Sequence, residues 1–210
     1  MVDKNVVRRG YDGLAETYAT ERDPDDREGE LLEGLLERLP ESGRLLDVGC
    51  GQGEPVLECL TDEPQLETLG IDLSREQLRF AREATAGVSL ARGDMTALPV
   101  ETNAFDAVTA FHSVIHVPKD DHQAVIDEFA RVLRPDGFVL MTEGTNDWQG
   151  TNPDWLESGV EMQWHIAGAE RTREQLRNAG FDICDEWLVG DELADEDAHW
   201  TVFLARLKDY

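Results

Sequence analysis

The sequence has few cysteines, few lysines and no long apolar run. Its three cysteines, Cys50, Cys59 and Cys184, form no CxxC pair, which excludes the common zinc-site spacings and argues against a disulfide framework. No run of about 18 apolar residues is present, and the N-terminus lacks the basic-then-apolar layout of a signal peptide, so membrane insertion is not expected. These absences predict a cytoplasmic protein with reduced thiols and no structural metal.

Positive charge is scarce throughout the chain. Lys and Arg number 19 against 45 Asp and Glu, for a formal net charge of −26. The acidic residues are spread over the whole length, which favours adaptation of the entire surface to high salt, as in a halophile, over a docking site for one cationic partner. No basic stripe is present that could replace the counterions of a phosphate backbone, so a nucleic-acid partner is not expected.

What the sequence does contain is a regular alternation of strands and helices. The 210 residues, of which 40% are apolar, suit one domain with a substantial core. Strand-like runs separated by helical patterns indicate a parallel sheet with right-handed crossovers. We expect strands over 44–48, 66–71, 88–91, 105–111 and 138–142, and helices over 3–20, 25–38, 54–62, 75–86 and 120–133.

The C-terminal part breaks this alternation. A helix over 171–179 precedes two strand-like segments, 181–189 and 200–207, and an acidic loop over 190–197 joins them. This loop is too short for a parallel crossover, so the two strands should be antiparallel. The expected fold class is therefore α/β, with a mostly parallel seven-stranded sheet, a C-terminal antiparallel hairpin and helices on both faces.

The most informative segment is the glycine-rich turn after the first strand, LLDVGCGQGEP over residues 45–55. Gly49, Gly51 and Gly53 form GxGxG, whereas a dinucleotide-binding turn needs GxGxxG, and Glu54 stands where that pattern has its third glycine. Because a carboxylate there would repel a pyrophosphate, and because Asp47 at the strand end suits a cation, the turn favours a ligand with an amine and no phosphate. This argues against an NAD-linked oxidoreductase on a similar sheet.

Acidic residues also follow the second and third strands. Asp72, in the run GIDLS, can accept hydrogen bonds from both hydroxyls of a ribose. Asp94 can accept from an adenine amino group while Met95 packs on the ring. Since parallel strands end at one edge of a sheet, the three strand ends together predict a site for an amino acid, a ribose and an adenine.

Five runs in order resemble the motif set of class I S-adenosylmethionine-dependent methyltransferases, in particular the ubiquinone/menaquinone-biosynthesis-like branch. They are DVGCGQGEP, GIDLS, RGDMTALP, FDAVTAFHSVIHVP and RVLRPDGFVLMTEG, and the resemblance covers roughly residues 10–145. One departure is Pro135-Asp136-Gly137, where many relatives have Pro-Gly-Gly; Asp is tolerated in turns. The resemblance implies a Rossmann-like fold, S-adenosyl-L-methionine as cofactor and S-adenosyl-L-homocysteine as product. The implied cofactor-binding residues are Tyr18, Asp47, Gly49, Cys50, Gly51, Gln52, Gly53, Asp72, Leu73, Asp94, Met95, Phe111 and His112.

The candidates for acceptor chemistry are fewer. A sulfonium already activates its methyl group, so transfer is an in-line displacement that needs alignment and exclusion of water, and it requires no metal. A general base is needed only for a hydroxyl or a protonated amine, and His116 is the tentative catalytic residue for this role. We expect residues 1–40 to form a helical lid that brings Tyr11 to the substrate, and residues 147–170 to form an aromatic, irregular insertion that covers it with Trp164 and His165. The remaining histidines, His122 and His199, are interpreted as surface or strand residues.

Several functions remain open at this point. The leading hypothesis is a single methyltransferase domain over 1–210 that acts on O, N, C or S of a small-molecule acceptor. A non-catalytic protein that binds adenosylmethionine or adenosylhomocysteine is the alternative, and so is a nucleic-acid or protein methyltransferase. No Asn/Asp-Pro-Pro-Tyr-like motif follows the fourth strand, which argues against methylation of base amino groups. The acceptor and the oligomeric state stay undetermined.

Overall fold

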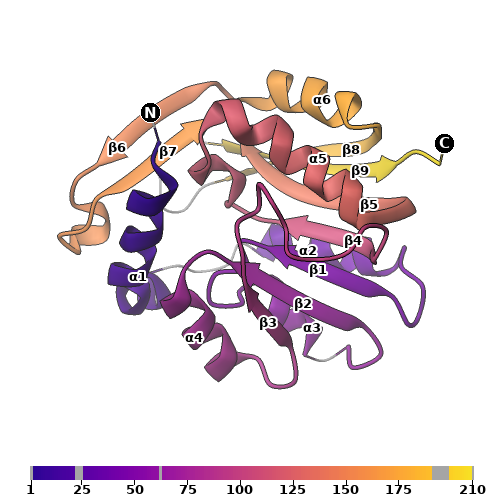
Figure 1. The fold of residues 1–210 in the computed structure, drawn as a ribbon, viewed down its shortest axis with the longest axis horizontal. Coiled ribbons are helices and arrows are strands. Elements are labelled where there is room, and N and C mark those ends of the chain that lie inside the picture. The colour runs from indigo at the N-terminus through magenta and orange to yellow at the C-terminus, as the bar shows by residue number, and fades with distance from the viewer. Residues whose placement is uncertain (1, 22–25, 62, 191–198, 210) are drawn as a thin grey trace.

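A seven-stranded sheet covered by helices on both faces forms the centre of the protein (Figure 1). The computed structural model describes residues 2–209 except 22–25, 62 and 191–198. Its helices are α1 (Lys4–Glu21), α2 (Asp26–Leu36), α3 (Val56–Leu60), α4 (Arg75–Ala84), α5 (His122–Val132) and α6 (Ala169–Asn178), with short 3-10 turns η1 (Val114–His116), η2 (Lys119–Asp121) and η3 (Trp155–Glu157). Its strands are β1 (Arg44–Val48), β2 (Glu67–Asp72), β3 (Ser89–Arg92), β4 (Phe105–Ala110), β5 (Leu133–Gly144), β6 (Trp148–Asn152), β7 (Met162–Ile166), β8 (Phe181–Gly190) and β9 (His199–Leu207).

The strand order of the main sheet is β3-β2-β1-β4-β5-β9-β8. Strands β1 to β5 pair in parallel, and β9 pairs antiparallel with both β5 and β8. This confirms the expected fold class, including the late hairpin. The chain moves outward from β1 to β3 and then returns to place β4 on the other side of β1, so the carboxyl ends of β1 and β4 border the crevice where such sheets bind ligands.

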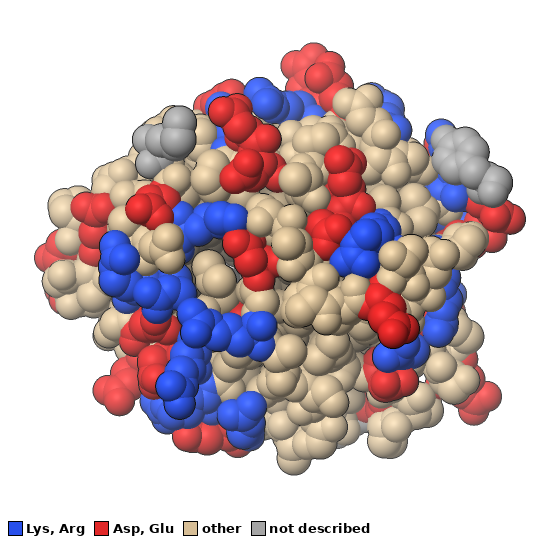
Figure 2. Space-filling model, viewed as in Figure 1, with Lys and Arg blue, Asp and Glu red and all other residues tan. Residues whose placement is uncertain are grey.

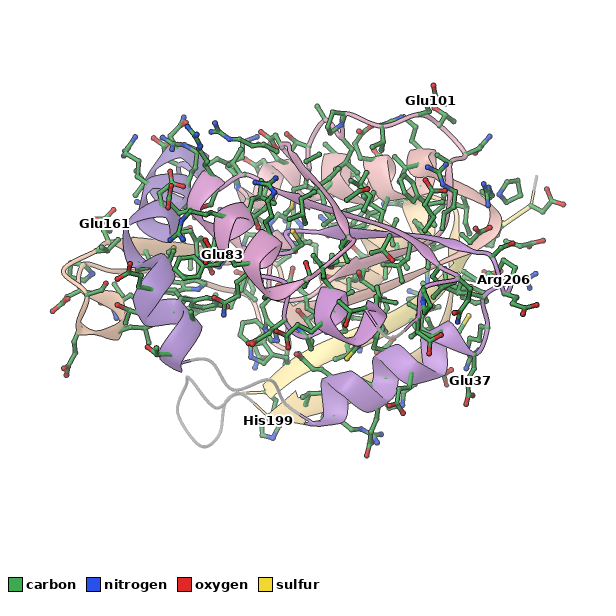
Figure 3. All side chains as sticks on the ribbon, turned by 90° about the horizontal axis from the view of Figure 1, so that it is seen from below. Glu37, Glu83, Glu101, Glu161, His199 and Arg206 are labelled. Carbon is green, nitrogen blue, oxygen red and sulfur yellow. The ribbon has the colours of Figure 1, made fainter. Side chains whose placement is uncertain are left out.

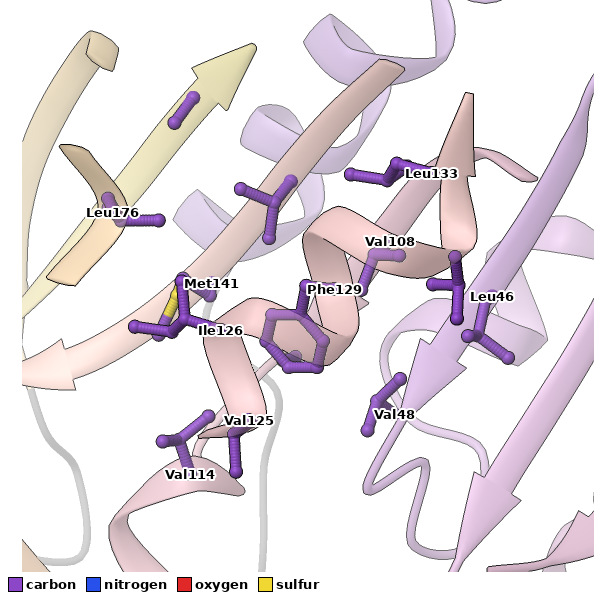
Figure 4. Close-up of a cluster of buried hydrophobic side chains, with 14 of the residues drawn as sticks. Leu46, Val48, Val108, Val114, Val125, Ile126, Phe129, Leu133, Met141 and Leu176 are labelled. Carbon is purple, nitrogen blue, oxygen red and sulfur yellow. The ribbon is translucent and has the colours of Figure 1, made fainter. Parts of the chain in front are cut away.

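Alternating side chains divide the apolar core between the two faces of the sheet. Leu46 and Val139 point to the face covered by α5 and α6, whereas Leu45 and Leu140 point to the face covered by α2, α3 and α4. Figure 4 shows the first of these clusters, in which Phe129 of α5 lies among side chains of the central strands. Neighbouring strand residues thus reach opposite cores, as expected for a doubly covered sheet.

The structure differs from the sequence expectations in two segments. The stretch over 147–170, expected to be irregular, contains an antiparallel pair of strands, β6 and β7. The mixed aromatic and polar composition of this stretch did not indicate these strands. β5 begins at Leu133, five residues before the strand expected over 138–142, because Leu133 pairs with Phe105. The Pro135-Asp136-Gly137 segment therefore lies inside the strand as an irregularity, with Asp136 at φ 66°. The acidic loop over 190–197 lies outside the described residues except for Gly190, which ends β8.

Carboxylate side chains lie on several sides of the surface. Figure 3 shows Glu37, Glu101 and Glu161 at different edges of the molecule. On the face seen in Figure 2, Lys and Arg gather over α1 and α4, yet acids accompany them: Arg79 pairs with both Glu76 and Glu83 of α4. Over the described residues, no helix combines the length and apolarity that a bilayer span demands.

Candidate functional site

A pocket lies where the carboxyl ends of β1, β2, β3 and β4 meet, and α1 covers it. All the cofactor-binding residues expected from the sequence line this pocket except Gly53. Lys4, Val7, Arg8, Tyr11 and Tyr18 of α1 line it from the opposite side. These positions recur at helical spacing, so one face of α1 is turned toward the pocket.

The glycine-rich turn is shaped by close backbone packing. Gly49 has φ 75°, and a Cβ there would lie 2.3 Å from the Cβ of Ser113. The N–H groups of Gly49 and Cys50 both donate to the carbonyl oxygen of Ile71. Gly53, at φ 110°, lies outside the lining; a Cβ there would press on Thr85 at 3.0 Å, so this glycine lets the turn approach α4.

Two buried carboxylates flank this turn. Thr109 donates to Asp47 at 2.8 Å, but burial raises the pKa of Asp47 to about 7, with a further contribution from the charge of Asp72. Asp72 accepts from the backbone N–H of Gly51 at 2.9 Å and of Ser74 at 2.7 Å. Burial raises the pKa of Asp72 above its ordinary value although these hydrogen bonds oppose the shift. A cation or a sugar diol in the pocket would stabilise both charges.

Asp94 already has a cationic partner in the structure. Lys4 of α1 donates to its carboxylate at 2.6 Å, and Thr96 donates at 2.8 Å. Burial alone would raise the pKa of Asp94, but these bonds and the Lys4 charge hold it below its ordinary value. No sequence pattern links Lys4 to Asp94, because the two are 90 positions apart and only the docking of α1 brings them together.

α1 is also fastened to the start of α4. The carboxylate of Asp12 accepts from the hydroxyl of Ser74 at 2.7 Å and from the backbone N–H of Arg75 at 3.0 Å. Ser74 itself accepts from the N–H of Gln77 as the N-cap of α4. Asp12 therefore satisfies N–H groups that a helix start leaves without a partner, from another helix.

His116 and Tyr11 meet on the pocket wall. Nδ1 of His116 donates to the carbonyl oxygen of Gln163 at 2.9 Å, so Nε2 carries the lone pair and accepts from the Tyr11 hydroxyl at 2.8 Å. Burial lowers the pKa of His116 to about 4, and nearby His112 contributes to this shift. At neutral pH the imidazole is therefore uncharged, and its Nε2 is a hydrogen-bond acceptor.

Aromatic rings connect this pair to the β6–β7 hairpin. Tyr11 lies edge-on to Tyr18, with ring centroids 5.5 Å apart, and to Trp155 at 6.1 Å. Trp164 packs on His116 at 5.9 Å, but it does not line the pocket itself. His165 lies outside the lining, and its Nδ1 accepts from the backbone N–H of Lys119. Of the three expected substrate-binding residues, only Tyr11 faces the pocket.

Two other histidines are held by buried partners. His112, in a left-handed conformation at φ 48°, places Nε2 2.5 Å from a carboxylate oxygen of Glu28, a residue that is 1% exposed. The interpretation of His122 as a surface or strand residue is wrong: it begins α5, is fully buried and bonds through Nε2 to the carbonyl oxygen of Val117. Polar residues at the start of a helix are usually exposed, so the sequence around His122 does not indicate that this side chain is buried.

The pocket also contains polar atoms without partners among the described residues. The side-chain oxygen of Gln52 and both amide atoms of Gln77 are buried and make no hydrogen bond. Buried amides need partners, and a ligand with hydroxyl, ammonium and carboxylate groups could provide them beside Asp47 and Asp72. These amides and carboxylates therefore fit an adenosyl amino acid as the ligand. In the described part of the chain, no three His, Cys, Asp or Glu side chains gather as a metal site.

Comparisons with known proteins show similarity to methyltransferases. Residues 45–137 match the family model described as a methyltransferase domain. The chain is 39% identical over 179 residues to the methyltransferase GfsG of Streptomyces halstedii, covering 78% of this chain and 62% of GfsG. It is 32% identical over 169 residues to a sterol 24-C-methyltransferase of Aspergillus fumigatus, covering 75% of this chain and 43% of that enzyme. The structure of the [4+2]-cyclase SpnF matches with a TM-score of 0.74 at 24% identity, over 97% of this chain and 96% of SpnF.

Proposed function

We propose that the chain transfers the methyl group of S-adenosylmethionine to a small-molecule acceptor and leaves S-adenosylhomocysteine. The match of residues 45–137 to a methyltransferase domain and the 39% identity to the methyltransferase GfsG support an assignment to the class I methyltransferases. The observation that supports this best is the pocket at the carboxyl ends of β1 to β4, in which the glycine-rich turn, Asp72 and Asp94 converge under α1. The curated relatives named above are longer than the part that matches, and they include a sterol methyltransferase, so the activity of the whole protein and its acceptor are parts of the proposal.

Different residues would hold the amino-acid end, the ribose and the adenine of the cofactor. Asp47 and the turn over 49–53 would hold the cationic amino-acid end, Asp72 and Leu73 the ribose, and Asp94 with Met95 the adenine. Tyr18, Phe111 and His112 complete the wall beside the turn. The cofactor supplies a methyl group activated by the sulfonium, and these residues align it and exclude water, which is the main requirement of an in-line displacement.

Calorimetric titration tests the cofactor assignment directly. We expect S-adenosylmethionine and S-adenosylhomocysteine to bind with one site per chain, and NADH not to bind. Incubation with donor labelled in the methyl group and an extract of small metabolites would then identify the acceptor through its labelled product. Absence of binding rejects the proposal. Binding without transfer to any metabolite, nucleic acid or protein supports the non-catalytic alternative.

His116 and Tyr11 form the base of the proposed reaction. The uncharged His116 presents its Nε2 to the Tyr11 hydroxyl, and Tyr11 lines the pocket. An acceptor hydroxyl, which becomes acidic as the methyl group arrives, would pass its proton to Nε2, either in place of the Tyr11 hydroxyl or through it. Trp164, which packs on the imidazole, and the hairpin over 147–170 would keep this pair dry.

Substitutions distinguish these two routes of the proton. His116→Gln should lower the rate of methyl transfer by about a hundredfold or more and leave the cofactor affinity nearly unchanged. Tyr11→Phe keeps the ring packing and should cause a similar loss only if the proton passes through the hydroxyl.

Because the pKa of His116 is about 4, the rate of methyl transfer by the wild type should not fall near pH 6.5. His165→Gln, outside the pocket lining, is the control. Full activity of His116→Gln would exclude a base at this position.

The proposal also includes the environment of the protein, its family branch and its domain organisation. The spread of carboxylates supports a halophilic protein, and the lack of a basic stripe supports the absence of a nucleic-acid partner. The lack of a long apolar run supports a cytoplasmic location without membrane insertion. The order of the motifs supports the ubiquinone/menaquinone-biosynthesis-like branch. We assign residues 1–40 as a lid, since α1 contacts the pocket along one face, and treat 1–210 as one methyltransferase domain.

A further inference from the structure

A buried carboxylate on α2 holds one of the histidines that line the pocket. Glu28 is 1% exposed, and its Oε1 lies 2.5 Å from Nε2 of His112. An ionised carboxylate can only accept hydrogen bonds, so Nε2 carries the hydrogen and donates it to Glu28. Burying a carboxylate is costly even when it is paired, and the reaction proposed above gives Glu28 no role.

The backbone and the ring of His112 are both fixed. Its φ of 48° lies in the left-handed region that residues other than glycine rarely adopt, and its N–H donates to the hydroxyl of the buried Thr142 at 2.5 Å. The ring of Trp200 packs edge-on against the imidazole, with centroids 4.9 Å apart. Together with the bond to Glu28, these contacts hold the imidazole in one orientation. Uncommon backbone conformations that several contacts maintain are concentrated at functional sites.

The other ring nitrogen of His112 is left for a ligand. Nδ1 has no hydrogen-bond partner among the described residues, and it is not one of the buried atoms that lack a partner. His112 lines the pocket, as do Tyr11 and His116. Because Nε2 carries the hydrogen, Nδ1 of the uncharged ring has a lone pair and accepts hydrogen bonds. The pocket wall after β4 therefore offers an acceptor nitrogen in addition to the Tyr11–His116 pair.

We propose that Glu28 is a positioning residue that fixes the ring and the tautomer of His112, so that Nδ1 accepts a hydrogen bond from a hydroxyl or amine group of the methyl acceptor. In the strand order β3-β2-β1-β4, the groups of the cofactor are assigned to the ends of β1 to β3, whereas β4 leads to His112 and His116. A carboxylate that accepts from an imidazole holds it in one tautomer and stabilises positive charge on the ring, as in a Ser-His-Asp triad. This inference rests on the proposed function and narrows its acceptor to molecules with a hydroxyl or amine group near the methylated atom.

Two substitutions of Glu28 and one control test this role. Glu28→Gln keeps the size of the side chain, but its amide is able to bond Nε2 of His112 either as acceptor or as donor, so the tautomer is no longer fixed. Glu28→Met removes the hydrogen bond with an apolar side chain of similar length and is the second variant should the first fail to fold. Glu33→Gln, the same change at an exposed position of α2, is the matched control. Thermal unfolding checks that each variant folds.

Nuclear magnetic resonance measures the tautomer without an acceptor. Long-range ¹H–¹⁵N spectra of protein with labelled histidine, recorded at neutral pH with bound S-adenosylhomocysteine, distinguish a ring nitrogen that carries a hydrogen from one that does not. Spectra of His112→Gln assign the signals of His112. We expect a hydrogen on Nε2 and none on Nδ1 in wild type and Glu33→Gln, and a mixture of tautomers in Glu28→Gln. A hydrogen on Nδ1 of wild-type His112 would contradict the inference.

Kinetics with the acceptor found by labelled methyl transfer measure the consequence. Glu28→Gln should raise the KM for this acceptor about tenfold while kcat changes less than about twofold, because an interaction that positions the acceptor is weakened. Its affinity for S-adenosylhomocysteine should equal that of wild type. An acceptor analogue without the hydroxyl or amine group should bind wild type more weakly than the acceptor does, and this difference should shrink in Glu28→Gln. Glu33→Gln should behave like wild type.

The outcomes separate this inference from the proposed function. If wild type transfers the methyl group and both Glu28 variants keep the same KM for the acceptor, Glu28 has only a structural role and the inference alone is wrong. An equal penalty for the analogue in wild type and variant also contradicts it. A tenfold loss of affinity for S-adenosylhomocysteine in Glu28→Gln would assign His112 to the cofactor instead. If wild type transfers no methyl group to any small molecule, the proposed function fails, and the acceptor role of His112 fails with it.

Discussion

Burial changes the chemistry of individual side chains in the pocket. Asp47 is a carboxylate whose pKa is raised to about 7 by burial, and His116 is an imidazole whose pKa burial lowers to about 4. Both shifts favour the uncharged form, as expected where water is excluded. The pocket therefore holds an uncharged base at neutral pH and a carboxylate that is ready to ionise when a cation arrives.

Asp47 should make the binding of a cationic ligand depend on pH. If only the ionised carboxylate attracts the sulfonium, the affinity for S-adenosylmethionine should rise about tenfold between pH 6 and pH 8, as the ionised fraction rises. Calorimetry over this range measures it. 5′-Methylthioadenosine, which has neither the sulfonium nor the amino acid, should show a flat profile. Asp47→Asn should flatten the profile for S-adenosylmethionine, and an unchanged slope in this variant would assign the dependence to another group.

The same carboxylate affects the stability of the unliganded protein. The folded pKa of about 7 lies above the ordinary aspartate pKa of 3.8, so the unfolded state releases its proton first as the pH rises. The contribution of Asp47 to stability is complete below pH 3.8 and is lost progressively up to about pH 7. Chemical unfolding should show that Asp47→Asn is more stable than wild type at pH 8, with the difference shrinking toward pH 4. A constant difference would contradict the assigned shift.

At the scale of the secondary-structure elements, α1 is held to the rest of the protein by contacts with several other elements. It is joined to the start of α4 through Asp12, to the turn after β3 through Lys4, and to η1 through Tyr11. Its aromatic side chains pack against Trp155 beside the β6–β7 hairpin. Buried Val7 and Leu14 of α1 also form a small apolar cluster with Met162 of β7, separate from the two clusters on the main sheet. An element held by such a peripheral cluster can open more readily than the central strands, which suits an element that must admit a ligand.

Asp12 offers a test of this attachment. Asp12→Ala removes the acceptor for Ser74 and Arg75 and should lower the free energy of unfolding by about 1 kcal/mol, the usual cost of losing a helix cap. Hydrogen exchange should accelerate over residues 4–21 while the central strands keep their protection. Glu16→Ala, an exposed acid on the same helix, should leave exchange unchanged. Acceleration spread evenly over the protein would indicate general destabilisation instead.

At the scale of the whole molecule, charge is the dominant feature. A net charge of −26 on 210 residues produces strong self-repulsion, and pairs such as Arg79 with Glu76 and Glu83 neutralise only part of it. Most of the carboxylates have no cation to balance them, because Lys and Arg number only 19. Screening by dissolved ions should therefore contribute to the stability of the fold.

Thermal unfolding in increasing KCl measures this contribution. The midpoint should rise by several degrees between 0.1 M and 1 M, a range over which the Debye length falls from about 10 Å to about 3 Å. The rise should be smaller at pH 5, closer to the sequence pI of about 4.3, because protonation then reduces the charge. An equal effect of KCl at both pH values would point to exclusion of salt from the surface, not to charge screening.

The strand and helix periodicities, together with the glycine-rich turn, sufficed to predict the sheet, its late antiparallel hairpin and the edge at which the pocket lies. These follow from local physics: side chains alternate along strands, glycines permit the turn at Gly49, and a short connection cannot form a parallel crossover. Only tertiary structure decided which distant groups meet. Lys4 reaches Asp94, Tyr11 reaches His116 and Gln77 faces the turn because α1 and α4 dock at the edge of the sheet, and no periodicity in the sequence encodes those distances.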